Sequence, residues 1–152
     1  MAFARNEKEV RAFYDSWKAP VFRFCLLFLG SEEQAGDATV RAFTGYLREH
    51  GELEAAKLPV LLVRLALEGA RGSCGALVST GSRNGDSLQQ AILRLPCEQR
   101  AVFILRNVLG MDRRDVSEVT GFSLQRVSEL WTRSMLTLRE QLPKEFFKEQ
   151  MR

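Results

Sequence analysis

The chain has 152 residues, a formal net charge of +3, 45% hydrophobic residues and 27% charged residues. This balance is typical of a globular protein and excludes a disordered or fibrous chain. The longest apolar runs, Phe24–Leu29 and Leu58–Val63, have six residues each, far fewer than the roughly 18 that cross a bilayer. Because the N-terminus also lacks the features of a secretory signal, we expect a cytoplasmic protein with no membrane span.

Helical periodicity covers most of the sequence, and no window alternates between apolar and polar residues as a half-buried strand does. The sequence therefore predicts an all-α fold. The first helical pattern begins near Val10, meets Pro20, which should break or kink it, and closes at Gly30. Ser31 starts a capping box for a second helix that runs to about His50. Pro59 suits the first turn of a third helix.

A change of composition divides the chain. Residues 71–86 are rich in glycine and serine and contain almost no bulky apolar residue, which predicts a flexible linker. It separates an N-terminal helical domain, residues 1–70, from a C-terminal domain, residues 87–142, followed by a tail, residues 143–152. Residues 1–68 carry a net charge of −1 and residues 87–142 a net charge of +2, so the positive excess lies in the second domain.

Four helical segments are predicted in the second domain. The first two are Leu88–Leu95 and Pro96–Leu109, the second ending at Gly110. Asp112 can cap a short helix that stops at Gly121, and Ser123 can cap a longer one that ends before Pro143. The expected inner face of this last helix carries the residues Leu124, Val127, Trp131, Ser134, Leu138 and Leu142.

The last two helices have the spacing of a helix-turn-helix, joined by a turn of about three residues that contains Gly121. In such a motif the second helix presents its N-terminal residues to base edges in the major groove, and nearby cations hold phosphates. Two short helices with a glycine turn also occur in plain helical bundles, which is the alternative reading. The candidate DNA-binding residues are Arg113, Arg114, Ser123, Gln125, Arg126, Ser128, Glu129, Thr132 and Arg133, with Arg139 as a further candidate for phosphate.

The cysteines and the histidine do not indicate a metal or catalytic site. Cys25, Cys74 and Cys97 are odd in number and widely spaced, so we expect inert thiols, with redox sensing as the alternative. His50 is the only histidine, and we expect it to face the dipole at a helix end. The chain has no phosphate-binding loop, dinucleotide fingerprint or zinc-protease motif. We therefore expect no enzyme, no cofactor, no metal and no small-molecule substrate.

Over nearly its full length the sequence resembles the small two-domain bacterial sigma factors of the extracytoplasmic-function type. The pattern LP-x-x-x-R-x-V-F-x-L-R, which opens the promoter-binding domain of that family, is matched from Leu95 through Arg106. The family's second helix-turn-helix element is matched by Val116–Gly121 and Val127, and the helices of its first domain by Phe13–Glu49.

The resemblance implies a first domain that docks on the RNA polymerase core, on its beta-prime subunit, and opens the −10 element. It implies a second domain that reads the −35 element, and an anti-sigma factor as a possible regulator. The candidate polymerase-binding residues are Asp37, Val40, Arg41 and Phe43.

Two departures from the family pattern keep other functions open. Arg41 reverses a charge where the family usually has an acidic surface, and no aromatic residue occurs between Tyr46 and Phe103 to stack on flipped bases. A sigma-like protein that binds an anti-sigma factor or another regulator without melting promoters is therefore the second hypothesis. A plain DNA-binding repressor or activator is the third.

Overall fold

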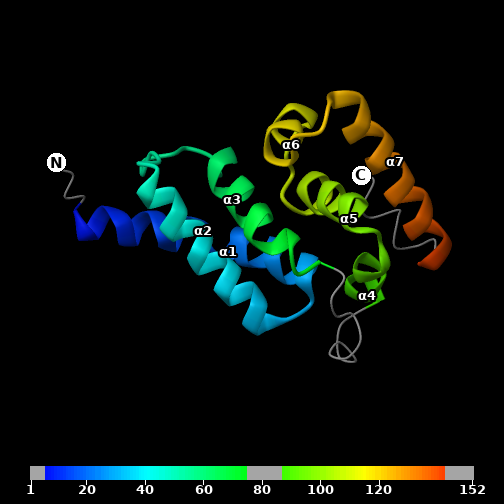
Figure 1. Ribbon diagram of the computed structural model, residues 1–152, viewed down its shortest axis with the longest axis horizontal. Helices are drawn as coiled ribbons and strands as arrows, with labels where there is room; N and C mark the ends of the chain where they lie inside the picture. The colour runs from blue at the N-terminus through cyan, green and yellow to red at the C-terminus, as the bar shows by residue number, and fades with distance from the viewer. Residues whose placement is uncertain (1–5, 75–86, 143–152) are drawn as a thin grey trace.

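The computed structural model describes residues 6–74 and 87–142, and in these ranges the chain is helical with no strand (Figure 1). This confirms the predicted all-α class. None of the described helices is both long and apolar enough to span a membrane. The elements are α1 Glu7–Leu29, α2 Glu32–Arg48, α3 Val60–Arg71, α4 Ser87–Arg94, α5 Cys97–Phe103, the π-helix η2 Ile104–Val108, α6 Arg113–Thr120 and α7 Leu124–Gln141.

Helix α1 runs through Pro20 as one element of 23 residues, so the proline does not break it. A proline inside a helix costs about 3 kcal/mol, but α1 buries apolar residues on both sides of it, among them Phe13 and Phe24. Gly30 ends α1 as predicted, with a φ of 75° that suits glycine.

Helix α2 begins at the predicted cap, where the Ser31 hydroxyl accepts a hydrogen bond from the Gln34 backbone N–H at 3.2 Å. Its apolar stripe packs against α1, and the Phe13 ring stacks on Tyr46 with centroids 5.0 Å apart. Helix α3 begins directly after Pro59, as predicted, and packs on α2 and α1. These three helices form the N-terminal half, on the left of Figure 1.

The segment predicted as one helix from Pro96 to Leu109 changes its geometry halfway. α5 ends at Phe103 and continues as the π-helix η2, in which the Leu109 N–H donates to the Ile104 carbonyl oxygen five residues earlier. Gly110 follows with a φ of 68°. Asn107 lies in η2 and contacts α7, where the indole Nε1–H of Trp131 donates to Asn107 Oδ1 at 2.7 Å.

Helix α7 packs against α5, but its inner face is rotated from the predicted one. Leu124 is 47% exposed and Trp131 is half-buried, whereas Leu130, which the prediction left out, is buried. The prediction for Leu124 was wrong because residues 124, 127 and 131 fit a helical period as well as 127, 130 and 134 do. The buried residues of α7 are Val127, Leu130, Ser134 and Leu138.

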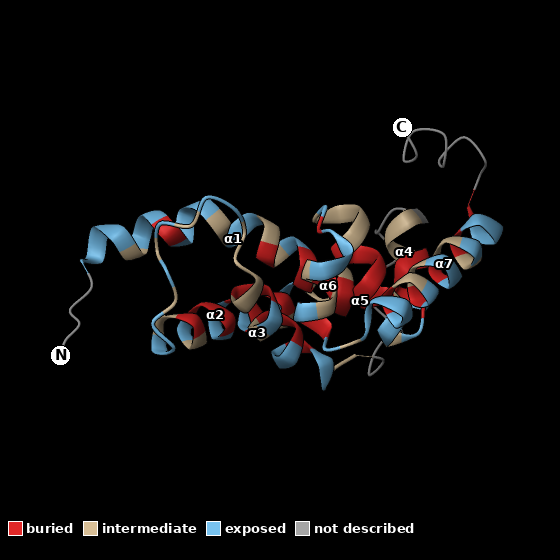
Figure 2. Cartoon of the chain, turned by 90° about the horizontal axis from the view of Figure 1, so that it is seen from above, coloured by how far each residue is buried: buried red, intermediate tan, exposed pale blue. Residues whose placement is uncertain are grey.

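The two halves meet in one continuous buried core (Figure 2). Arg100 of α5 lies at their junction with only 3% of its surface exposed. Its guanidinium donates to Phe28 O at 2.7 Å, Leu93 O at 2.6 Å, Leu95 O at 3.0 Å and Ile92 O at 3.2 Å, and to Cys74 Sγ at 3.2 Å. One side chain of the C-terminal half thus binds the end of α1. The glycine-rich residues 75–86 of the predicted linker lie outside the described residues.

A disulfide joins Cys74, just after α3, to Cys97, the first residue of α5, with Cα atoms 6.1 Å apart. The prediction of inert thiols was therefore wrong for two of the three cysteines. The spacing of the cysteines in the sequence does not indicate this disulfide. Packing between the two halves brings the end of α3 close to the start of α5. Cys25 is a free, buried thiol, as expected of a small apolar residue.

Candidate nucleic-acid interface

The turn between α6 and α7 is built by short local contacts. Gly121 takes the left-handed conformation at φ 83°, and its N–H donates to the Ser117 carbonyl oxygen at 2.8 Å. The Ser117 hydroxyl donates to the Phe122 carbonyl oxygen at 2.6 Å. Val116 and Val127 are fully buried, one on each helix. The predicted helix-turn-helix is therefore present.

Both helices of the motif begin at the predicted caps. The Asp112 carboxylate accepts from the Asp115 N–H at 2.9 Å, and the Ser123 hydroxyl accepts from the Arg126 N–H at 3.1 Å. The caps fix where each helix starts, and so decide which side chains of its first turn face outward. Arg113 and Arg114 occupy the first turn of α6, and Gln125 and Arg126 the first turn of α7.

The structure places the predicted DNA-binding residues on the first turn of α6, at the cap of α7 and on the first half of α7, and leaves most of them exposed. Ser128 is partly buried. The other eight are exposed: Arg113, Arg114, Ser123, Gln125, Arg126, Glu129, Thr132 and Arg133.

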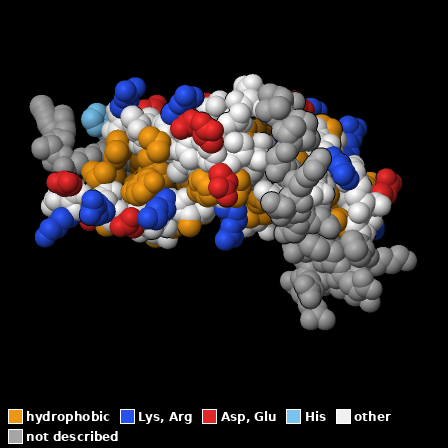
Figure 3. All heavy atoms as spheres, turned by 90° about the horizontal axis from the view of Figure 1, so that it is seen from below, with side chains coloured by type: hydrophobic (Ala, Val, Ile, Leu, Met, Phe, Trp, Pro, Cys, Tyr) orange, Lys and Arg blue, Asp and Glu red, His pale blue; other side chains and the backbone are white. Residues whose placement is uncertain are grey.

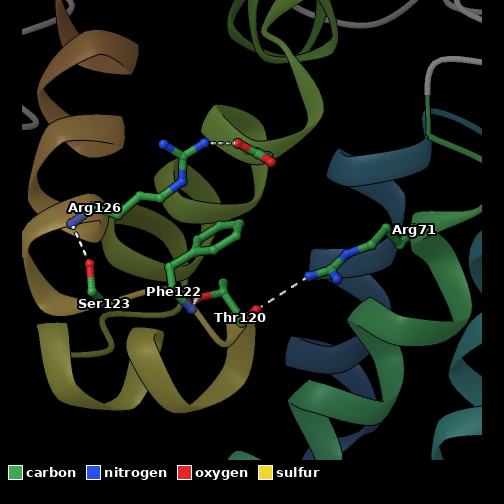
Figure 4. Close-up of polar contacts among 6 residues, drawn as sticks. Arg71, Thr120, Phe122, Ser123 and Arg126 are labelled. Atoms are coloured by element: carbon green, nitrogen blue, oxygen red, sulfur yellow. Dashed lines mark hydrogen bonds and ion pairs between the residues drawn. The ribbon is translucent and has the colours of Figure 1, made fainter.

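Several of these side chains are held by neighbours. Arg126 forms an ion pair with Glu98 of α5 and lies over the Phe122 ring, 5.5 Å from its centroid (Figure 4). Gln125 donates to Glu129 at 3.2 Å, one helical turn further along α7. These contacts orient the first turns of α7 before any ligand is bound.

A concave surface separates the start of α6 from α7. Arg113 donates to the Ser128 hydroxyl at 3.2 Å, across this space. The Arg106 guanidinium lies 5.5 Å from the Trp131 ring centroid and donates to the Met111 carbonyl oxygen. A hollow of about 260 Å³ lies here, lined by Arg106, Arg113, Val127, Ser128, Trp131 and Thr132. Two arginines at one hollow offer a place for a phosphate group.

The turn of the motif faces the N-terminal half. Arg71, the last residue of α3, donates to the Thr120 carbonyl oxygen at 3.5 Å (Figure 4). Lys57 forms an ion pair with Asp115 at 3.5 Å.

The predicted polymerase-binding residues lie on α2 and divide into two groups. Asp37, Val40 and Arg41 are exposed, Val40 by 57%. Phe43 is buried, with its ring 4.8 Å from that of Tyr14. The first three form an exposed face of α2, and Phe43 supports that helix from within.

The space-filling view adds an apolar region at the end of the molecule that carries His50 (Figure 3). Hydrophobic side chains gather there among charged groups of both signs. At this end, the start of α1 and the end of α2 enclose a groove of about 450 Å³ whose lining includes Val10, Tyr14, Phe43 and Leu47.

Three residues of the interface were not predicted from the sequence. Glu98 binds Arg126, Phe122 supports its guanidinium, and Arg71 contacts the turn. Phe122 carries a sequence signal, because an aromatic residue within a glycine turn four residues before an arginine can pack against it. Glu98 and Arg71 carry no such sequence signal, because Arg126 lies 28 residues from Glu98 and Thr120 lies 49 residues from Arg71.

The fold and the exposed face of α7 define a helix-turn-helix domain. Residues 85–138, about a third of the chain, match the family model described as Sigma-70, region 4. This match implies DNA binding and promoter recognition in transcription initiation for that part of the chain. No curated protein sequence matches the chain.

Proposed function

We propose that the protein is a sigma factor of the extracytoplasmic-function type, which binds RNA polymerase core in the cytoplasm and directs it to promoters. The match of residues 85–138 to Sigma-70, region 4 carries this proposal. The exposed start of α7 supports it, because the residues there have the chemistry for reading base edges.

In this proposal Arg126 and Arg133 read bases, while Arg113 and Arg114 at the start of α6 hold phosphates. Arginine binds guanine through two hydrogen bonds, which gives it directional specificity. To bind the duplex, Arg126 breaks its ion pair with Glu98. The Glu98 carboxylate therefore competes with the DNA for the Arg126 guanidinium. Gln125 and Glu129 add one amide and one carboxylate at the same end of α7.

We expect Arg126→Ala and Arg133→Ala each to weaken binding to a specific duplex by about 1 to 3 kcal/mol. The measurement is fluorescence anisotropy with a duplex selected by the wild-type protein, beside a scrambled one. Arg48→Ala, which removes an exposed arginine at the end of α2, is the matched control. Equal losses on both duplexes would mark phosphate contacts, and no loss on either would contradict the assignment.

The exposed face of α2, Asp37, Val40 and Arg41, is the proposed docking surface for the beta-prime subunit. We expect Val40→Asp to reduce the recovery of polymerase core from host lysate at least about tenfold, because it places a charge where an apolar side chain would be buried. Leu136→Asp is the matched control, since Leu136 is 54% exposed on α7. Equal recovery with Val40→Asp and the wild type would move the docking surface elsewhere.

The second candidate is a sigma mimic that binds a regulator, such as an anti-sigma factor, without opening promoters. It is favoured by the lack of aromatic residues between Tyr46 and Phe103, where the family resemblance leads one to expect stacking platforms for flipped bases. Transcription with purified core polymerase on genomic templates separates the two. Specific transcripts support the sigma factor. Recovery of a small regulator from lysate, with no polymerase and no transcript, supports the mimic.

A further inference from the structure

The disulfide between Cys74 and Cys97 links the N-terminal half to the C-terminal half next to the buried Arg100. Both cysteines are partly buried, and neither belongs to the helix-turn-helix. Disulfides in cytoplasmic proteins are usually transient or redox-sensing. In the cytoplasm, where the proposed function places the protein, this disulfide is therefore expected to form and break.

The two sulfur atoms have different surroundings. Cys74 Sγ lies 3.2 Å from the Arg100 Nη1, which donates to it. No carboxylate among the described residues pairs with Arg100, whose other donations go to carbonyl oxygens. Burial lowers the pKa of the Arg100 guanidinium from its ordinary value. A thiolate on Cys74 would give this buried cation an anionic partner, so Cys74 is the better leaving group of the pair.

Cys97 borders a space through which a second thiol can reach the disulfide. It lines a cavity of about 240 Å³ between the two halves, together with Phe28, Leu67, Arg71, Glu98, Ala101 and Phe122. Cys74 is not among the residues that line it. A cavity of this size admits water-sized groups, and so has room for the reactive end of a small thiol.

We propose that Cys74 and Cys97 form a reversible thiol-exchange site with a fixed direction of attack. The thiolate of a small thiol or a protein dithiol enters the cavity and attacks Cys97 Sγ. The disulfide bond breaks, a new S–S bond forms between Cys97 and the attacking sulfur, and Cys74 leaves with the electron pair as a thiolate beside Arg100. A second thiolate of the reductant then displaces Cys97, which leaves as a thiolate and takes up a proton, while the reductant becomes a disulfide.

The exchange changes how the halves are connected. In the oxidised protein the disulfide ties Cys74, just after α3, to the start of α5. In the reduced protein this cross-link is absent, and the two halves are held together at this point by non-covalent contacts such as the hydrogen bond from Arg100 to Phe28 O. Because Cys97 is followed directly by Glu98, the partner of Arg126, an adduct on Cys97 lies close to that ion pair. This chemistry does not depend on which macromolecule the protein binds.

The test begins with thiol counting on the full-length protein after mild oxidation. One thiol titratable after denaturation is expected, that of Cys25, whose pKa burial raises to about 11 in the folded protein. Three thiols would overturn the proposal. The oxidised, folded protein is then treated with limiting reduced glutathione, quenched with acid and mapped by mass spectrometry of its peptides.

We expect the glutathione adduct on Cys97 to exceed that on Cys74 by at least about tenfold, because the leaving group decides which sulfur is attacked. The same reaction in urea is the control, where both sulfurs should react alike once Arg100 and the cavity are gone. An adduct mainly on Cys74, an equal mixture in the folded protein, or no reaction before unfolding would each overturn the proposal. A folded Arg100→Gln variant should lose the preference for Cys97.

Discussion

Replacing Arg100 with methionine is expected to lower the free energy of unfolding by about 4 kcal/mol. The methionine keeps most of the apolar stem of arginine but removes every donor. Four buried carbonyl oxygens, those of Phe28, Ile92, Leu93 and Leu95, then lose a charged hydrogen-bond donor, and water has little access to replace it. Urea unfolding followed by circular dichroism measures the change.

Arg94→Met is the matched control for Arg100→Met, because Arg94 is exposed at the end of the neighbouring helix α4. A change within about 0.5 kcal/mol is expected for such a surface position. A stability of Arg100→Met within about 1 kcal/mol of the wild type would mean that the carbonyl groups find other donors and that Arg100 does not hold the two halves together.

Phe28→Ala is expected to cost about 3 to 5 kcal/mol, the range for removing a buried aromatic ring. Phe28 is 1% exposed, stacks on Phe24 with centroids 5.7 Å apart, and lies 5.6 Å from the Arg100 guanidinium carbon. Phe28 borders the cavity between the halves, so removing its ring would enlarge that cavity. We expect the neighbouring side chains not to fill the enlarged space.

Because the core is continuous, we expect Phe28→Ala to destabilise both halves in one transition. Trp17 lies in α1 and Trp131 in α7, so single-tryptophan variants report each half by fluorescence during urea unfolding. Leu136→Ala, at a position 54% exposed on α7, is the control. An unchanged Trp131 midpoint in Phe28→Ala would show that the halves unfold independently, and would favour the two separate domains that the sequence predicts.

The helix boundaries were predictable because the signals that set them are local. Ser31 and Ser123 cap α2 and α7, and Gly30 and Gly121 end α1 and α6, each through contacts with residues at most four positions away. The orientation of α7 was not predictable in the same way. Two stripes, one through Leu124 and one through Leu130, fit the helical period, and only packing against α5 decides between them.

The contacts between the halves were beyond local patterns. Arg100 reaches Phe28, 72 residues earlier, and Cys74 pairs with Cys97 across residues 75–96. One signal for Arg100 was present, since it falls between Cys97 and Ile104 at the spacing of the apolar face of its helix. For the candidate interface, helical periodicity indicated the exposed side chains of α7 other than Leu124, but the ion pair of Arg126 with Glu98 depends on how α5 and α7 pack.

The π-helix η2 affects the direction in which the chain continues toward α6. A π-turn holds one residue more than an α-turn, so the chain leaves it rotated by about 100° relative to an uninterrupted α-helix. The Met111 N–H donates to the Leu105 carbonyl oxygen and anchors the exit of this turn. The direction in which α6 and α7 project therefore depends on the number of residues between Phe103 and Asp112. We expect a deletion of one residue there to turn α7 relative to α5 while leaving every side chain on α7 unchanged.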